Sequence, residues 1–362
     1  MRIFKRILDK ARPHFEENGR FSRFHNVFQA MDNFLFAAPL KVEQRPFIRD
    51  PLDVKRYMSL VITALVPCLI ASVYFFGWRV LLLLIVSYVV GGIVEVLFAV
   101  IRKEEVNEGF LVTGFIFPLI LPPGLPLWIA AVGILFGVLV GKEVFGGTGR
   151  NLFNPALVGR VFLALGYPAA MTSNWIEPAS GGWGRIVMPI AQAAGDAVTS
   201  ATPLVAAKGS VYAAPLDLFL GRVLGSAGET SALAILLGGI FLLIVGVASW
   251  RTVFSIILSF TVFNVVVRAA APQLVGPLWF NLLAGSFLFG TFFMATDPVS
   301  GPVTRTGKWG YGILIGGVTM LIRTFSGFVE GVMFAILLGN IFAPLIDEAV
   351  IRARMRRYAR EG

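Results

Sequence analysis

The chain has 362 residues, of which 56% are hydrophobic and only 14% charged, and its formal net charge is +10. Soluble globular chains carry about 25% charged residues, so this composition excludes an ordinary soluble domain. One cysteine and two histidines, both histidines near the N-terminus, exclude a disulfide framework, a thiolate metal centre and a bis-histidine haem within a membrane. The composition predicts an all-α polytopic membrane protein.

Apolar runs of the length that a membrane helix needs recur along the whole chain. We predict about ten transmembrane segments, at 57–76, 80–101, 110–121, 126–141, 156–171, 231–249, 252–270, 279–296, 310–323 and 327–346. They divide the chain into five parts. A basic N-terminal segment with an interfacial helix (1–56) is followed by a first five-helix half (57–171), a long loop (172–230), a second five-helix half (231–346) and a basic tail (347–362).

The positive charge gathers beside these apolar runs. Twelve Lys or Arg residues precede the first run, and five lie in the segment 352–360. Counted with the short loops, this topology places 24 basic residues on one side and six on the other. The positive-inside rule therefore predicts that both termini are cytoplasmic and that the loop 172–230 is outside. Because the basic residues flank membrane segments, we expect no nucleic-acid partner.

Two predicted segments are interrupted. The run 110–121 ends in Pro122-Pro123-Gly124, and the run 279–296 ends in Thr296-Asp297-Pro298. Five segments per half, an odd number, would make the halves inverted repeats, and paired breaks of this kind indicate an ion or substrate site near the membrane midplane. The alternative is a plain proline kink, which membrane helices tolerate.

Acidic residues within or beside apolar runs are the first candidates for chemistry. Glu95, Asp297 and Asp347 could handle a cation or a proton, because an unpartnered acid in lipid is costly. The alternative is an internal salt bridge, for which Arg160 is the expected partner.

Two glycine-containing segments are candidate binding surfaces. Gly91 and Gly92 lie one helical turn before Glu95 and could open a slot for a flat quinone ring, or could simply let helices pack closely. The segment 141–155 is rich in glycine, and its Asn151 and Asn154 offer donors and acceptors for the edge of a heterocycle. A packed turn is the alternative for this segment.

Four segments, in this order along the chain, carry a specific resemblance: GKEVFGGTGRNLFNPALVGR, SATPL, GSAGETSALAILLGG and FGTFFMATDPVSGP. Together they resemble the NqrB/RnfD superfamily, whose members are membrane subunits of the sodium-translocating NADH:quinone oxidoreductase and of the Rnf electron-transport complex. The N-terminal stretches RPHFEENGRF, AMDNFLFAAP and RDPLDVKRYM are similar to the quinone-reductase member.

The resemblance implies two flavins. A threonine in the outer loop of this family is esterified to the phosphate of FMN, and the matching residue is Thr202, with Ser200 where the family pattern has glycine. Riboflavin is held non-covalently near the residues that match Asn151 and Asn154. The family's quinone site matches Gly91 and Gly92.

The resemblance also implies a function and partners. The acids that match Glu95, Asp297 and Asp347 belong to the family's sodium path. The expected function is to relay electrons from NADH-derived partners through FMN and riboflavin to ubiquinone, coupled to sodium export. The implied partners are the other subunits of a six-subunit membrane complex, including those with FAD and iron–sulfur centres and a second FMN, and a flavin transferase. The alternatives are the Rnf member of the superfamily and a non-redox secondary transporter.

Overall fold

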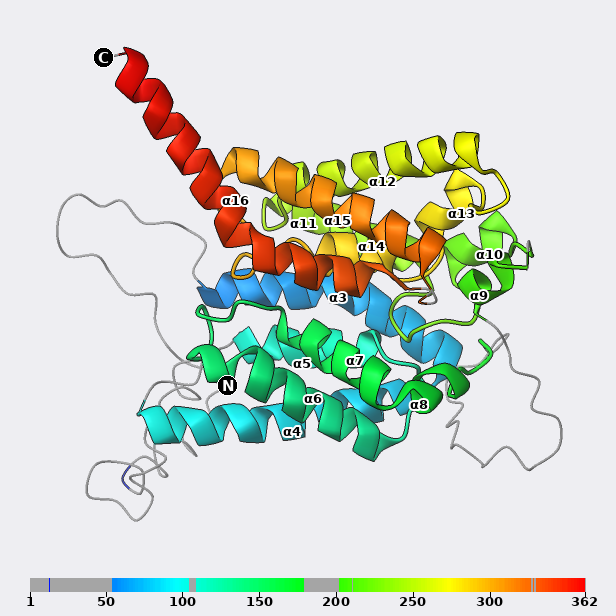
Figure 1. Ribbon diagram of the computed structural model, residues 1–362. Helices are drawn as coiled ribbons and strands as arrows, with labels where there is room; N and C mark the ends of the chain where they lie inside the picture. Colours follow the sequence, from blue (N-terminus) through cyan, green and yellow to red (C-terminus); the bar gives the residue numbers. More distant parts are fainter. Residues whose placement is uncertain are drawn as a thin grey trace.

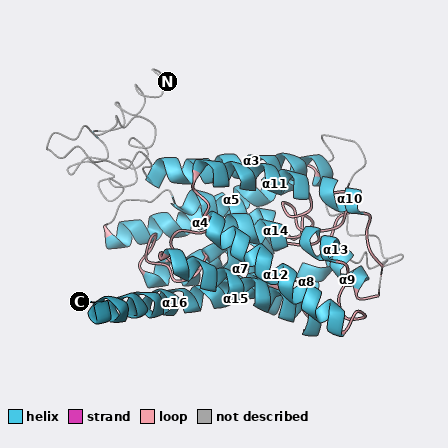
Figure 2. Cartoon of the chain, turned by 90° about the horizontal axis from the view of Figure 1, so that it is seen from above, coloured by secondary structure: helices cyan, strands magenta, loops and turns pink. Residues whose placement is uncertain are grey.

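A computed structural model describes residues 13, 54–103, 109–178, 202–209, 211–326, 328 and 330–361. All the regular secondary structure in these residues is helical (Figures 1 and 2). The predicted interfacial helix within residues 1–56 lies outside the described residues, as does the part of the outer loop that precedes Thr202.

Five helical stretches of the described chain are long and apolar enough to cross a membrane, which makes this a membrane protein. They are α3 (Val54–Phe76), α4 (Arg79–Arg102), α6 (Leu127–Gly141) with the short helix η2 (Glu143–Phe145), α12 (Trp250–Ala270) and α16 (Val332–Glu361). At 1.5 Å per residue, the 23 residues of α3 extend about 35 Å, more than the apolar thickness of a bilayer.

Most of the remaining predicted segments are shorter or broken. Three apolar helices have 11 to 14 residues, namely α5 (Gly109–Leu119), α7 (Pro155–Gly166) and α11 (Ala232–Val245). The predicted run 279–296 consists of α13 (Leu278–Leu283), α14 (Phe287–Phe289) and the π-helix η3 (Gly290–Met294), and it is followed by α15 (Arg305–Phe325). Three small helices lie beside the long ones, namely α8 (Pro168–Ser173), α9 (Pro203–Ala207) and α10 (Pro215–Leu220).

The last helix differs from the prediction. The sequence predicts a span ending at 346 and a separate basic tail, but α16 continues as one helix to Glu361 (Figure 1). The residues after Asp347 include neither glycine nor proline before the last residue, and Ala, Arg, Met and Glu favour helix, so nothing ends it earlier.

The long helices pack in two groups (Figure 1). In one, α4 packs against α5 and α6, and α6 packs against α7. In the other, α12 packs against α15, and α15 against α16. Between the groups, α3 packs against α5 on one side and α11 on the other.

Glycine permits the closest of these approaches. A Cβ atom at Gly238 of α11 would lie 1.9 Å from the Ala64 carbonyl oxygen of α3, and one at Gly316 of α15 would lie 2.0 Å from the Ser259 hydroxyl of α12. Backbones can approach this closely only where a side chain is missing, which is how small residues bring membrane helices together.

Candidate functional site

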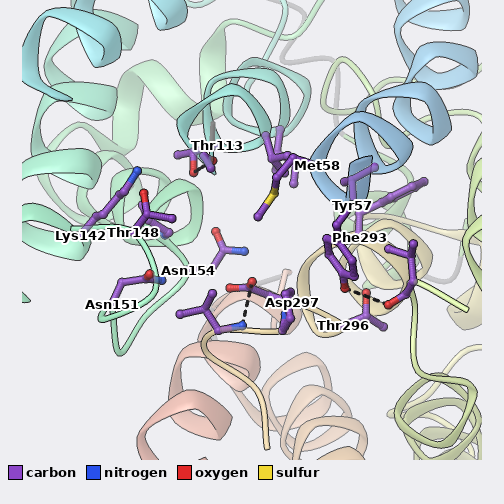
Figure 3. Close-up of a pocket in the computed structure, with 18 of the residues that line it drawn as sticks. Tyr57, Met58, Thr113, Lys142, Thr148, Asn151, Asn154, Phe293, Thr296 and Asp297 are labelled. Atoms are coloured by element: carbon purple, nitrogen blue, oxygen red, sulfur yellow. Dashed lines mark hydrogen bonds between the residues drawn. The ribbon is translucent and has the colours of Figure 1, made fainter. Parts of the chain in front are cut away.

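A cavity of about 70 Å³ opens where the two helix groups meet beside α3 (Figure 3). Its walls come from distant parts of the chain: Tyr57 of α3, Thr113 of α5, the segment 142–155, and the residues that follow η3. Figure 3 shows Asn154 and Asp297 facing the same space, with Lys142 and Thr148 on one side and Tyr57 and Phe293 on the other. The cavity therefore brings together three predicted site residues, Asn151, Asn154 and Asp297.

The asparagine segment is a compact turn that ends by capping a helix. Gly146, Gly147 and Gly149 have φ angles of +111°, +90° and +88°, which residues with side chains rarely adopt. The Asn154 side-chain oxygen accepts a hydrogen bond of 3.1 Å from the Ala156 backbone N–H, which makes it the N-cap of α7. Its amide nitrogen forms no hydrogen bond within the described chain.

The second asparagine of this segment is held more locally. The Asn151 amide nitrogen donates to the Phe153 carbonyl over 2.9 Å, and the residue is buried while lining the cavity. Its side-chain oxygen accepts no hydrogen bond from the described residues. One donor and one acceptor are thus available on neighbouring amides, as the edge of a heterocycle requires.

Asp297 lies where the second interrupted segment ends. Pro298 cannot continue a helix, and the chain turns after η3. The Asp297 carboxylate accepts one hydrogen bond from the Val299 N–H, at 3.3 Å, and one from the Ser300 hydroxyl, at 2.7 Å. No basic side chain pairs with it in the part of the chain that the structure describes.

Glu95 has a different environment. Its carboxylate forms an ion pair with the Lys142 ammonium, and both side chains are buried. The alternative of an internal salt bridge is therefore what the structure has, but the expected partner was wrong. Arg160 instead binds two other carboxylates, Glu229 at 2.8 Å and Glu330. The pairing depends on the neighbouring helix, since α4 packs against α6, at whose end Lys142 lies.

Asp347 joins two helices outside the cavity. It lies on α16 and accepts hydrogen bonds from the backbone N–H groups of Val303, at 2.7 Å, and Thr304, at 3.0 Å, and from the Thr304 hydroxyl. Thr304 is in turn the N-cap of α15. The carboxylate thus fixes the start of α15 against α16.

Gly91 and Gly92 lie at helix contacts of α4. A Cβ atom at Gly91 would lie 3.3 Å from the Ile134 side chain of α6, and one at Gly92 would lie 3.5 Å from the Phe110 ring. Neither glycine lines the cavity that holds the asparagines.

Thr202 lies at a second, smaller cavity of about 20 Å³ that shares no lining residue with the first. It precedes α9, and its hydroxyl forms no hydrogen bond with the described residues. The walls of this cavity include Ser226, Glu229 and Glu330, the partners of Arg160. The predicted site residues therefore fall into two separate regions.

Sequence reasoning missed several residues of these regions. Lys142, Thr113 and Tyr57 line the first cavity, and Arg79 binds the first helix break. A signal for Lys142 was present: Glu95 and Arg102 are seven residues apart on one helix, and Lys142 and Glu143 carry the opposite charges in the next long segment.

These features define a helical membrane protein with a cavity between two helix groups, whose wall holds two asparagine amides and a carboxylate with no basic partner among the described residues. The chain belongs to the NQR2, RnfD, RnfE family, whose sequence pattern matches residues 41–356. It is 40% identical to the B subunit of the Na(+)-translocating NADH-quinone reductase of Azotobacter vinelandii, with 98% of each chain covered. It is 39% identical to the same protein of Pseudomonas aeruginosa strain PAO1 and 36% to that of Klebsiella pneumoniae, each with 99% of both chains covered.

Proposed function

We propose that this chain is the subunit of a sodium-translocating NADH:quinone reductase that relays electrons to ubiquinone within the membrane. The observation that carries the proposal is the similarity over nearly the whole length to relatives named as the B subunit of that enzyme. The similarity includes the N-terminal residues that the family match leaves out, which favours the quinone reductase over the Rnf complex. The other subunits of a six-subunit complex, with their FAD, iron–sulfur and FMN groups, would supply the electrons.

Polar side chains of the first cavity would suit one edge of riboflavin. The free Asn154 amide nitrogen and Asn151 oxygen suit the donors and acceptors of a flavin's pyrimidine edge, and Tyr57 and Phe293 supply aromatic walls. Bound there, the flavin would supply one- and two-electron transfer. The protein's part is to orient it through the two amides and to exclude bulk water by burial between the helix groups.

The Thr202 hydroxyl fits a phosphoester to FMN. A hydroxyl without a partner among the described residues, half-buried at the edge of a cavity, would be available to a flavin transferase before the complex assembles around it. We propose that the quinone binds at Gly91 and Gly92, because α4 has two adjacent positions without side chains there. We also propose that the chain consists of two inverted five-helix halves. The packing supports this, because α4 packs against α6 and α6 against α7 in the same order as α12 packs against α15 and α15 against α16.

Sodium export is the energy-conserving step of the proposal. Asp297 is the best-placed sodium ligand, because its carboxylate borders the cavity and has no basic partner among the described residues. Moving one charge against 100 mV costs about 2.3 kcal/mol, which an electron transfer to quinone can supply. In this proposal both termini are cytoplasmic in the bacterial inner membrane, and Asp347 lies near the inner end of the path.

The test is covalent flavin at Thr202. Co-expressed with a flavin transferase, the chain should gain the mass of one FMN less water, and the denatured band should fluoresce under ultraviolet light. Thr202→Ala should lose both signals. Thr230→Ala is the matched control, because Thr230 lines the same cavity and should keep the flavin. A Thr202→Ala chain that keeps the flavin contradicts the assignment, and a wild-type chain without flavin favours a plain transporter.

A further inference from the structure

Two ion pairs of opposite polarity join α4 to the end of α6. Glu95 and Arg102 are seven residues apart, which is two helical turns and therefore one face of α4. They bind two adjacent residues: Glu95 binds the Lys142 ammonium, and Arg102 binds the Glu143 carboxylate at 2.7 Å. A second Arg102 nitrogen also donates to the Glu143 carbonyl. We call these two pairs the double clamp.

The double clamp lies at the start of the turn that contains Asn151 and Asn154. The Lys142 carbonyl accepts backbone hydrogen bonds from Phe145 and Gly147, each 3.2 Å long, and so forms the first part of the turn. Gly147 also lies against Arg102: a Cβ atom there would be 3.3 Å from a guanidinium nitrogen. Whatever moves Lys142 or Arg102 therefore moves the start of the segment that ends at Asn151 and Asn154.

Lys142 reaches the cavity and Glu95 does not. The Lys142 side chain lines the cavity wall, whereas Glu95 lies behind it with its side chain 5% exposed. The Glu95 carboxylate is already neutralised by the ammonium, so a sodium ion would have to displace a bound cation to reach it. Removing one member of such a buried pair leaves a lone charge in a poorly solvated place, whereas removing both does not.

We infer that Glu95 is a positioning residue: through Lys142 it holds the turn with Asn151 and Asn154 in the geometry that binds the flavin, and it does not ligate sodium. As far as the flavin is concerned, this rests on the proposed function. Only Asp297 of the predicted acids then faces the cavity directly.

The experiment compares Glu95→Gln, Lys142→Met and the double variant in the complete complex. Two quantities are measured: the riboflavin released by acid per complex, and the sodium concentration that half-activates quinone reduction. Each single variant should retain riboflavin at least about tenfold less tightly, because it strands one buried charge. The double variant should recover most of the riboflavin and show the wild-type sodium requirement.

The matched control is Glu348→Gln. Glu348 forms an ion pair of 2.5 Å with Arg352, but that pair is exposed, so its loss should change neither quantity. The inference is overturned if the double variant stays as defective as Glu95→Gln and needs more sodium, since Glu95 would then be a sodium ligand. Should a single variant fail to assemble, recovery of assembly in the double variant supports the clamp, and no recovery overturns it.

Failure of the proposed function has a separate signature. A wild-type complex that releases no riboflavin contradicts the proposed function and says nothing against the clamp. The double clamp is then tested by the rate at which maleimide labels Thr148→Cys, a position in the turn. The label should react faster in the single variants than in the wild-type and double-variant backgrounds, and equal rates in all four would overturn the inference.

Discussion

The two interrupted segments are alike in sequence and unlike in structure. After α5 the chain breaks at Pro122–Pro126, and the guanidinium of Arg79 binds the carbonyls that the break sets free. It donates to the carbonyl oxygens of Pro123, Gly124 and Leu125 at 3.1, 3.2 and 2.8 Å. The protein's own cation therefore closes the first break.

The second break, after η3, is not closed in this way, although earlier in the same segment the Arg323 guanidinium donates to the carbonyls of Asn281 and Ala284 between α13 and α14. No guanidinium of the described chain donates to the segment 295–302, and the charged group there is the Asp297 carboxylate at the cavity wall. Two similar interruptions of the sequence thus have different structural roles. A break filled by a fixed arginine stabilises the fold, while a break left with an unpaired carboxylate beside a cavity can bind a mobile cation.

The largest effect should come from removing the cation of the first break. Arg79→Met would leave three carbonyls without their donor in a buried place, at about 1–3 kcal/mol for each unsatisfied group. We expect little or no assembled complex, measured by its yield and melting temperature in detergent. Arg79→Lys, which keeps the charge but not the planar fork, should recover part of the yield. Normal stability of Arg79→Met would show that the first break needs no resident cation.

The smallest effect should come from Arg251, which stands at the start of α12 as Arg79 stands at the start of α4. Its guanidinium lies over the Trp250 ring, 4.7 Å from the ring centre, and forms no hydrogen bond within the described residues. An exposed contact of this kind contributes about 0.5–1 kcal/mol, so Arg251→Met should assemble normally and melt within a few degrees of wild type. A loss of complex as severe as with Arg79→Met would mean that both breaks depend on an arginine.

The sequence predicts where the breaks lie but not which side chains bind there. Proline and glycine mark both interruptions, because they end helices wherever they stand. The sequence holds a signal that is compatible with the pairing of Glu95 with Lys142 but does not determine it, since the pairing depends on which helix α4 packs against. Asp347 likewise looked like Asp297, yet it binds backbone N–H groups at the start of α15.

The candidate site shows the same limit. The glycines and asparagines of the segment 141–155 predict a turn from their residue types alone, either a packed turn or a binding turn. That Thr113, Tyr57 and Asp297 complete the same cavity follows only from the tertiary fold, because five separate stretches of the chain supply its walls. The separation of Thr202 from that cavity was equally invisible in the sequence.

The central claim is that the second break holds the mobile cation, and Asp297→Asn in the complete complex tests it most directly. Asparagine keeps the shape and one acceptor oxygen, which can still accept from the Val299 N–H, while an amide NH2 that can donate to the Ser300 hydroxyl replaces the other oxygen and the charge is removed. We predict that quinone reduction becomes slower and needs about tenfold more sodium for half-activation, which corresponds to ~1.4 kcal/mol, while the contents of both flavins stay normal. Glu43→Gln, in the basic N-terminal segment outside the described residues, should leave the sodium requirement unchanged. A wild-type sodium requirement in Asp297→Asn, with full flavin content, would contradict the account.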